Sequence, residues 1–208
     1  MKAFIYTGGD IFPENITEHP KADDITVAAD GGYKNAQKLG DSVQILVGDL
    51  DSLDRSFVSD KTKIITVPAE KDFTDTKLAA DTAIEAGATE LVIIGGLSGR
   101  LDHTLANLAL LKELTLAGIY AIIADGKNRV RYINSTSMLI AKSGYKYLSL
   151  IIDSDKIKGV DIEGCKYPLK NATLTKADQT LTVSNEITGN CALVSVRRGG
   201  LYIIESAD

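Results

Sequence analysis

Short apolar runs alternate with segments of helical period through the first 125 residues. The runs are rich in β-branched residues and predict strands at 2–7, 25–29, 43–47, 63–67, 91–94 and 119–124. The segments between them predict helices at 33–39, 53–59, 76–86 and 101–116. Several runs are apolar at nearly every position, which is typical of parallel strands covered by helices on both faces. This part therefore predicts an α/β domain with an open, mostly parallel, Rossmann-like sheet.

The pattern changes after Asp125. From there the chain shows short apolar runs broken by turn residues, and no segment keeps a helical period over ten or more residues. Strands are expected at 129–133, 137–141, 145–152, 159–162, 180–183, 192–196 and 201–205. Short strands of this kind favour an all-β sandwich or a barrel. We expect two domains, an α/β domain at 1–126 and a β-sandwich at 127–208.

Composition and charge narrow the class of protein. Hydrophobic residues make up 44% of the 208 residues and charged residues 25%, as in a globular protein. A net charge of −5 without a dense basic block argues against nucleic-acid binding. No apolar run approaches the roughly 20 residues that span a bilayer, and the first residues lack the apolar core of a signal peptide. We expect a cytoplasmic protein without membrane contact.

The two cysteines, Cys165 and Cys191, lack the spacing of a metal or redox motif. We expect both to be small buried side chains, because free cysteine packs readily inside proteins.

Four loops follow predicted strands and carry the residues that could bind a ligand or take part in catalysis. They span 30–32, 48–52, 71–75 and 95–100, and they are rich in aspartate and glycine. In an open parallel sheet, ligands bind beyond the carboxyl ends of the strands. We therefore expect the four loops to meet at one edge of the sheet.

Two aspartate pairs stand in these loops. Asp49 and Asp51 would point to the same side of an extended segment, and Asp72 and Asp75 would be neighbours at a helix start. Each close pair would repel by roughly 4 kcal/mol at about 4 Å with an effective dielectric near 20. A cation would relieve this repulsion, and Mg²⁺ suits carboxylates beside substrate phosphates. The alternative is structural: aspartates of turns, with Asp72 as a helix cap and Asp75 in the first turn.

A second group follows the glycine-rich loop and comprises Arg100, Asp102, His103 and Asn107. Leucines at 101, 105 and 108 would bury one face of this helix, so Arg100, His103 and Asn107 would lie close together on roughly the opposite side. Free backbone N–H groups and a neighbouring arginine make an anion site. Glycine clusters are, however, often plain turns, and a single histidine is often a surface residue. Both groups together indicate metal-assisted phosphoryl or pyrophosphoryl transfer.

Five stretches resemble those of the thiamine pyrophosphokinase (thiamine diphosphokinase) family, in the same order and at similar spacings. They are AADGG (28–32), GDLDS (48–52), EKDFTDTKLA (70–79), GGLSGRLDHTLANL (95–108) and SNEITG (184–189). The resemblance extends over both expected domains.

The resemblance implies a homodimer with the active site between chains, in which thiamine lies in a cleft that includes the partner's sandwich. The family transfers the pyrophosphoryl group of ATP to the thiamine hydroxyl, giving thiamine diphosphate and AMP. Magnesium would be held by Asp49, Asp51 and Asp72, which together with Asp75 form the catalytic set. We expect Asp75 to contact thiamine and to accept its hydroxyl proton.

The resemblance also implies further ligand contacts. On the ATP side they are Asp30, Gly31, Lys77, Gly95, Gly96, Arg100, Asp102, His103 and Asn107. On the thiamine side they are Ser184, Asn185 and Glu186.

Two features depart from the family pattern. Ser98 stands where many relatives have a further glycine, and the chain has no tryptophan to cover a thiazolium ring. A tyrosine could supply the cation–π contact instead, although a strand tyrosine is often only packed. The candidates are Tyr145, Tyr147, Tyr167 and Tyr202.

Three other functions share some of these features. A related pyrophosphokinase would act on another alcohol, and a thiamine or nucleotide sensor would bind without turnover. Four aspartates argue against a pure binder. A phosphatase of the DxD type would carry that motif after the first strand, where this chain has Thr7-Gly8-Gly9.

Overall fold

The computed structural model describes residues 1–49, 58–66 and 73–208. It divides into two compact units, Met1–Gly126 and Lys127–Asp208. The predicted helix at 53–59 falls almost entirely outside the described residues, and Val58 and Ser59 are not helical.

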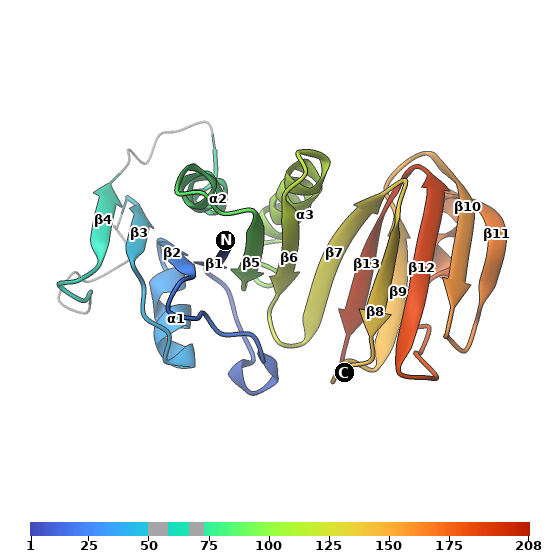
Figure 1. Ribbon diagram of the computed structural model, residues 1–208, viewed down its shortest axis with the longest axis horizontal. Coiled ribbons are helices and arrows are strands. Elements are labelled where there is room, and N and C mark those ends of the chain that lie inside the picture. Colours follow the sequence, from blue (N-terminus) through green and yellow to red (C-terminus); the bar gives the residue numbers. More distant parts are fainter. Residues whose placement is uncertain (50–57, 67–72) are drawn as a thin grey trace. The chain divides into compact units, whose positions relative to one another are not determined.

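The first unit contains a parallel sheet. Its strands are β1 (Lys2–Tyr6), β2 (Ile25–Ala29), β3 (Ile45–Gly48), β4 (Lys63–Thr66), β5 (Glu90–Ile94) and β6 (Tyr120–Ala124). They lie in the order β4-β3-β2-β1-β5-β6, and every neighbouring pair is parallel (Figure 1). From β1 the chain adds strands on one side as far as β4 and then continues on the other side with β5. The order of the strands therefore reverses between β1 and β5, and such a reversal is where α/β sheets bind ligands.

Helices connect these strands. They are the short η1 (Pro13–Asn15), α1 (Gly32–Leu39), α2 (Asp75–Glu85) and α3 (Leu101–Leu116). Helix α1 buries Tyr33 and Ala36 in one core cluster with Phe4 and Tyr6 of β1. Helix α2 contacts β1, β2 and β3 and buries three alanines, which allow a close approach to the sheet. In the described parts of the chain, no helix has both the length and the apolar character needed to cross a membrane.

The second unit is a β-sandwich of antiparallel sheets. One sheet has the order β7-β13-β9, formed by Asn128–Asn134, Gly200–Ser206 and Tyr147–Ile152. The other has the order β11-β10-β12-β8, formed by Leu169–Thr175, Lys156–Glu163, Cys191–Arg198 and Ser137–Ala141. One core cluster joins both sheets, with Leu150 and Ile203 from the first and Val160 and Val194 from the second. The predicted fold class, an open α/β sheet followed by a β-sandwich, is confirmed.

One strand prediction in this unit was wrong, and one strand was not predicted. Residues 180 and 181 belong to the short helix η3 (Lys176–Leu181), and 182 and 183 lie in no strand. Asp178 accepts hydrogen bonds from the backbone N–H and the hydroxyl of Thr175, and this capping box starts the helical turn. Strand β11 was not predicted, because its Lys170-Asn171-Ala172 segment looks like a turn. Asn171 has a left-handed φ of 51°, where the pairing of β10 with β11 shifts register.

Two burial predictions also need correction. Helix α3 buries Asn107, Leu110, Leu111 and Leu114, whereas Leu101 and Leu105 are exposed. The expected leucine stripe was therefore placed on the wrong side of the helix: positions 107, 110, 111 and 114 share the face that was predicted to be polar. Of the cysteines, Cys165 is buried and Cys191 is exposed at the start of β12.

Candidate active site

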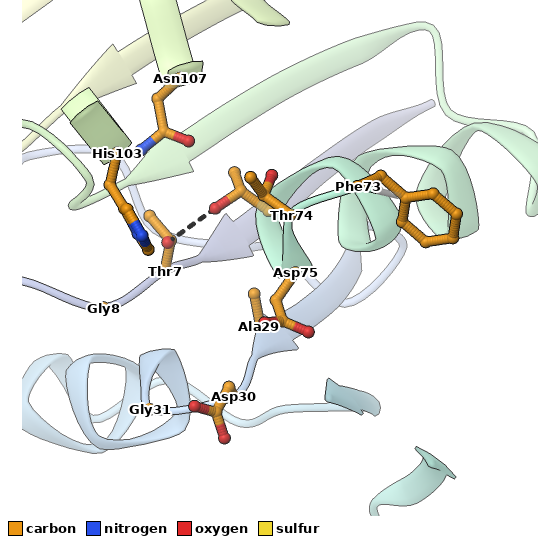
Figure 2. A pocket seen from close by; sticks show the side chains of 11 residues that line it. Thr7, Gly8, Ala29, Asp30, Gly31, Phe73, Thr74, Asp75, His103 and Asn107 are labelled. Atoms are coloured by element: carbon orange, nitrogen blue, oxygen red, sulfur yellow. Dashed lines mark hydrogen bonds between the residues drawn. The ribbon is translucent and has the colours of Figure 1, made fainter. Parts of the chain in front are cut away.

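A pocket of about 560 Å³ lies at the carboxyl ends of β1 and β2, beside the point where the strand order reverses. Figure 2 shows side chains that line it, from the ends of two strands and the starts of α2 and α3. The lining residues are Thr7, Gly8, Ala29, Asp30, Gly31, Phe73, Thr74, Asp75, Thr76, His103 and Asn107. Its volume is in the range of small-molecule sites.

The start of helix α2 brings Asp75 to the pocket. Thr74 is the N-cap residue, and its hydroxyl oxygen accepts a hydrogen bond from the N–H of Lys77 at 3.2 Å. Asp75 follows in the first turn, where the positive end of the helix dipole stabilises a carboxylate. The cap is therefore Thr74, not Asp72, and Asp75 is half-buried at the pocket wall.

The end of β2 brings Asp30 to the same pocket. Its φ of 44° is left-handed, and its N–H donates to the carbonyl of Val47 at 2.8 Å. This bond places Asp30 beside the end of β3, where a Cβ on Gly48 would lie 3.1 Å from that of Asp30. Asp49 follows Gly48 directly, so Asp30 and Asp49 occupy adjacent strand ends. Gly31 is the N-cap residue of helix α1 and completes this wall.

Hydrogen bonds of the Asn107 and Ser98 side chains hold the loop after β5 in place. Gly95 and Gly96 have left-handed φ values of 93° and 75°. Asn107 of α3 is 4% exposed and donates a hydrogen bond to the carbonyl of Gly96 at 2.9 Å. Ser98 accepts a hydrogen bond from the N–H of Asp10 at 2.7 Å, which joins this loop to the one after β1. The serine that departs from the family pattern therefore connects two loops.

Arg100 and Asp102 form an exposed pair at the start of α3. The guanidinium donates to both carboxylate oxygens, at 3.1 and 2.6 Å, and the two side chains are 72% and 64% exposed. The hydrogen bonds from Arg100 lower the pKa of Asp102, and those to Asp102 raise the pKa of Arg100. Neither residue lines the pocket, whereas His103 and Asn107 of the predicted group do. The structure thus brings half of that group to the site.

Lys77 is engaged elsewhere. Its ammonium group lies 2.6 Å from a carboxylate oxygen of Asp81 and 3.2 Å from one of Glu113. It is not among the residues that line the pocket, so its role in ATP binding stays a prediction.

The three predicted thiamine contacts lie in the second unit. Asn185 is 6% exposed, and its amide is occupied: the oxygen accepts from the N–H groups of Tyr167 and Glu186, and the nitrogen donates to the carbonyl of Tyr167. Ser184 has a left-handed φ of 58°, and Glu186 lies 3.7 Å from Lys166. Asn185 therefore holds the backbone of Tyr167, and the contacts of Ser184, Asn185 and Glu186 with thiamine stay predictions.

The four tyrosines considered for thiamine binding differ in their surroundings. Arg129 covers the ring of Tyr145 and Lys146 covers that of Tyr147. Tyr202 packs edge-on against Tyr132, with ring centroids 4.9 Å apart. Tyr167 is the most open of them, at 59% exposed, although Lys166 lies 5.6 Å from its ring centroid.

The predicted magnesium ligands can be examined only in part. Asp51 and Asp72 lie outside the described residues, and only Asp49 of the expected set is described. Within residues 1–49, 58–66 and 73–208, no three acidic, histidine or cysteine side chains group closely enough to hold a metal ion. Asp30 and Asp49 at adjacent strand ends and Asp75 in the first turn of α2 are nevertheless hard oxygen donors, the kind that Mg²⁺ prefers.

Sequence reasoning missed several lining residues, namely Thr7, Gly8, Ala29, Phe73, Thr74 and Thr76. Thr7 and Gly8 could have been found, because they follow the first predicted strand at the same edge as the other loops. The threonines of 74–76 resemble ordinary cap residues in sequence and carry no separate signal.

The fold and this pocket define a two-domain protein with a ligand site at the carboxyl edge of an α/β sheet. Two family models match the chain: the thiamin pyrophosphokinase catalytic domain over residues 17–130 and the thiamin pyrophosphokinase vitamin B1 binding domain over residues 136–201. The chain belongs to the thiamin pyrophosphokinase family.

Individual relatives agree with this assignment. The chain is 36% identical over 141 residues to the thiamine pyrophosphokinase of Bacillus subtilis, an alignment that spans 67% of this chain and 65% of that protein, just under two thirds of its length. The crystal structure of thiamine pyrophosphokinase from Bacillus subtilis superposes with a TM-score of 0.90 and 27% identity over the whole of both chains. A thiamin pyrophosphokinase family protein from Enterococcus faecalis gives a TM-score of 0.82 and 29% identity, again over both whole chains.

Proposed function

We propose that this protein is a thiamine diphosphokinase, which transfers the pyrophosphoryl group of ATP to the hydroxyl group of thiamine and releases AMP. The observation that carries the proposal is the pocket of the first unit. Apart from Thr7 and Gly8, its lining residues lie within the match to the family's catalytic domain, and it brings Asp30, Asp75, His103 and Asn107 to one cavity. In this proposal the enzyme works in the cytoplasm.

Asp75 is the proposed proton acceptor. The thiamine hydroxyl gives its proton to the Asp75 carboxylate while its oxygen forms a bond to the β-phosphorus of ATP. The bond between the β-phosphorus and the oxygen that bridges it to the α-phosphorus breaks, and AMP leaves with that oxygen. A base must lie within hydrogen-bond reach of the proton it accepts, and Asp75 lies at the pocket wall in a capped first turn.

The nucleotide is proposed to lie along the loops after β1 and β5. Asn107 holds the Gly96 carbonyl, and Ser98 joins the two loops, so their backbone is ordered before a ligand arrives. Preorganised backbone costs less to order on binding. His103 at the same wall is available to contact a phosphate or the adenine.

Magnesium is the proposed metal, held by Asp49, Asp51 and Asp72 with Asp30 nearby. When bound, Mg²⁺ supplies positive charge that neutralises the ATP phosphates. The protein's own part is to keep carboxylates at adjacent strand ends, through the bond from the Asp30 N–H to Val47.

The thiamine side is proposed to include Ser184 and Glu186, with Asn185 holding the backbone that carries Tyr167. We further propose a homodimer in which the active site lies between chains. A family match to a vitamin B1 binding domain at 136–201 supports the second unit as the thiamine-binding part.

The test is a product assay with Mg²⁺-ATP and a panel of alcohols that includes thiamine and a hydroxymethyl pterin. The proposal expects AMP to form with thiamine. AMP formed only with another alcohol would assign a different pyrophosphokinase, and ADP or phosphate would assign a different reaction. Tight thiamine binding without any turnover would identify a sensor instead.

A further inference from the structure

Thr7 is held by all three of its polar groups. Its N–H donates to the carbonyl of Ile94 at 3.0 Å, and its own carbonyl accepts from the Asn35 side chain at 2.8 Å. Its hydroxyl lies 2.9 Å from that of Thr76. Thr7 follows the central strand β1 and is 7% exposed. Its three bonds connect it to β5, α1 and α2. Three contacts therefore hold Thr7 in place where it lines the pocket.

Thr76, at the start of α2, contacts Thr7 through its hydroxyl group. It is the residue after Asp75 and is 6% exposed, so its hydroxyl has little access to water. The contact between its hydroxyl and that of Thr7 is the dashed line in Figure 2. Because threonine is branched at Cβ, its χ1 angle has few alternatives in a helix. A buried hydroxyl that loses its partner is costly, which keeps the two groups together.

This contact differs in kind from the cap of the same helix. Thr74 bonds to Lys77 within α2 and so stabilises the turn without fixing it to anything else. The hydroxyl pair joins the first turn to the end of β1. The direction of the Asp75 side chain depends on how that turn is oriented. A shift of about 1 Å in a reacting group can cost roughly a hundredfold in rate.

We infer that Thr7 and Thr76 are a positioning pair for the proposed reaction, which hold the Asp75 carboxylate toward the thiamine hydroxyl through the orientation of the first turn of α2. The inference rests on the proposed function and adds residues that do not themselves touch reacting atoms. It explains why two threonines are buried at the floor of a polar pocket, where apolar side chains of similar volume would pack as well.

The experiment compares Thr76→Val with Thr76→Ser in steady-state kinetics. Valine keeps the shape and removes the hydroxyl, whereas serine keeps the hydroxyl. For Thr76→Val we expect kcat to fall roughly 10- to 100-fold, with both KM values within about threefold of wild type, because only the alignment of the base changes. Thr76→Ser is expected to recover kcat to within about threefold of wild type.

Thr82→Val is the matched control. Thr82 lies on the same helix, and its hydroxyl donates to the carbonyl of Leu78 within that helix at 2.8 Å. Its removal tests the general cost of losing a helix hydroxyl, and kcat is expected to stay within about twofold of wild type. Thermal melting of each variant checks that it is folded. Thr7→Val approaches the same contact from β1 and serves if Thr76→Val does not fold.

The double variant Thr7→Val/Thr76→Val completes a double-mutant cycle with the two single variants. If the hydroxyls act as one unit, its kcat is no lower than that of the worse single variant. Equal kcat for Thr76→Val and Thr82→Val, or a rise in KM with kcat unchanged, would overturn the inference while wild-type AMP formation still supports the proposed function. Absence of AMP formation in the wild type would overturn the function and the inference together.

Discussion

The side-chain amide of Asn107 donates a hydrogen bond to the carbonyl of Gly96 at 2.9 Å, in a site closed to water. A Cβ on Gly96 would lie 2.5 Å from the nitrogen of that amide and 2.9 Å from the methyl group of Thr7. The glycine, the asparagine and the threonine therefore fix one another where the loop after β5 meets β1.

Gly96→Ala should lower the free energy of unfolding substantially. The left-handed φ of 75° costs a non-glycine residue about 1–2 kcal/mol, and the crowding adds about 1–3 kcal/mol. Gly99→Ala is the control, because its φ of 82° is equally left-handed but its Cβ would meet nothing within 4 Å. Urea unfolding measures both. Equal losses would show that Asn107 and Thr7 yield to the new methyl group.

Asp75→Asn should lower turnover far more than ATP binding. The amide has the size of the carboxylate and keeps its place in the first turn of α2, but it cannot accept the proton. We therefore expect kcat to fall by roughly 10²–10⁴. Glu85→Gln is the control on the same helix, since Glu85 is the last residue of α2 and does not line the pocket. Kinetics together with calorimetric ATP titration separate the two effects. Matching losses in turnover and ATP affinity would rule out a proton-acceptor role.

Glu205→Gln should destabilise the second unit at neutral pH. Glu205 is 2% exposed and accepts hydrogen bonds from Arg129 and Arg131. Glutamine keeps an oxygen acceptor but not the negative charge that compensates two largely buried guanidinium groups, and removing one partner of a buried ion pair typically costs about 3–5 kcal/mol. Asp208→Asn removes one side of an exposed pair with Lys146 and should change stability by less than about 1 kcal/mol.

The same residue predicts a pH dependence. Burial alone would raise the pKa of Glu205, but the hydrogen bonds and charges of Arg129 and Arg131 outweigh burial and hold its pKa below the ordinary value. Its stabilising effect is therefore full above the unfolded-state pKa of about 4.3 and is lost as the pH falls through the folded-state pKa. The difference in unfolding free energy between wild type and Glu205→Gln should stay constant from pH 7 to about 5 and then narrow. A difference that widens on acidification would contradict the assignment.

The two cysteines should differ in reactivity. Cys191 is exposed, whereas Cys165 is 8% exposed and burial raises the pKa of its thiol, so less thiolate forms there. With an aromatic disulfide reagent on the native protein, we expect one fast and one slow thiol. The fast reaction should disappear in Cys191→Ser and persist in Cys165→Ser. Two slow thiols in the wild type would show that Cys191 is covered in solution.

The parallel sheet could be predicted well because its strands are continuous apolar runs separated by helical segments. Strand β11 could not be predicted, because Asn171 introduces a register shift that looks like a turn in sequence. The buried face of α3 was placed on the wrong side of the helix, since spacing alone does not say which leucines meet the sheet. Leu101 and Leu105 share the spacing of a core stripe and yet are exposed.

The sequence predicted at which edge of the sheet the site lies, but not all of the residues that line it. Asp30, Gly31, Asp75, His103 and Asn107 do line one pocket, as parallel strand ends require. Arg100 was expected there, but its exposed pairing with Asp102 has no signature in sequence. The hydroxyl contact of Thr7 with Thr76 joins residues 69 positions apart, and only the strand order brings them together.

The strand order also governs when the pocket can exist during synthesis. Its walls come from residues 7 and 8 at one extreme and from Asn107 at the other. A nascent chain that has not yet released α3 from the ribosome holds only part of the lining, and contacts so distant in sequence form slowly. Ligands can therefore assist folding only after α3 has emerged, so the pocket needs most of the first unit but none of the second.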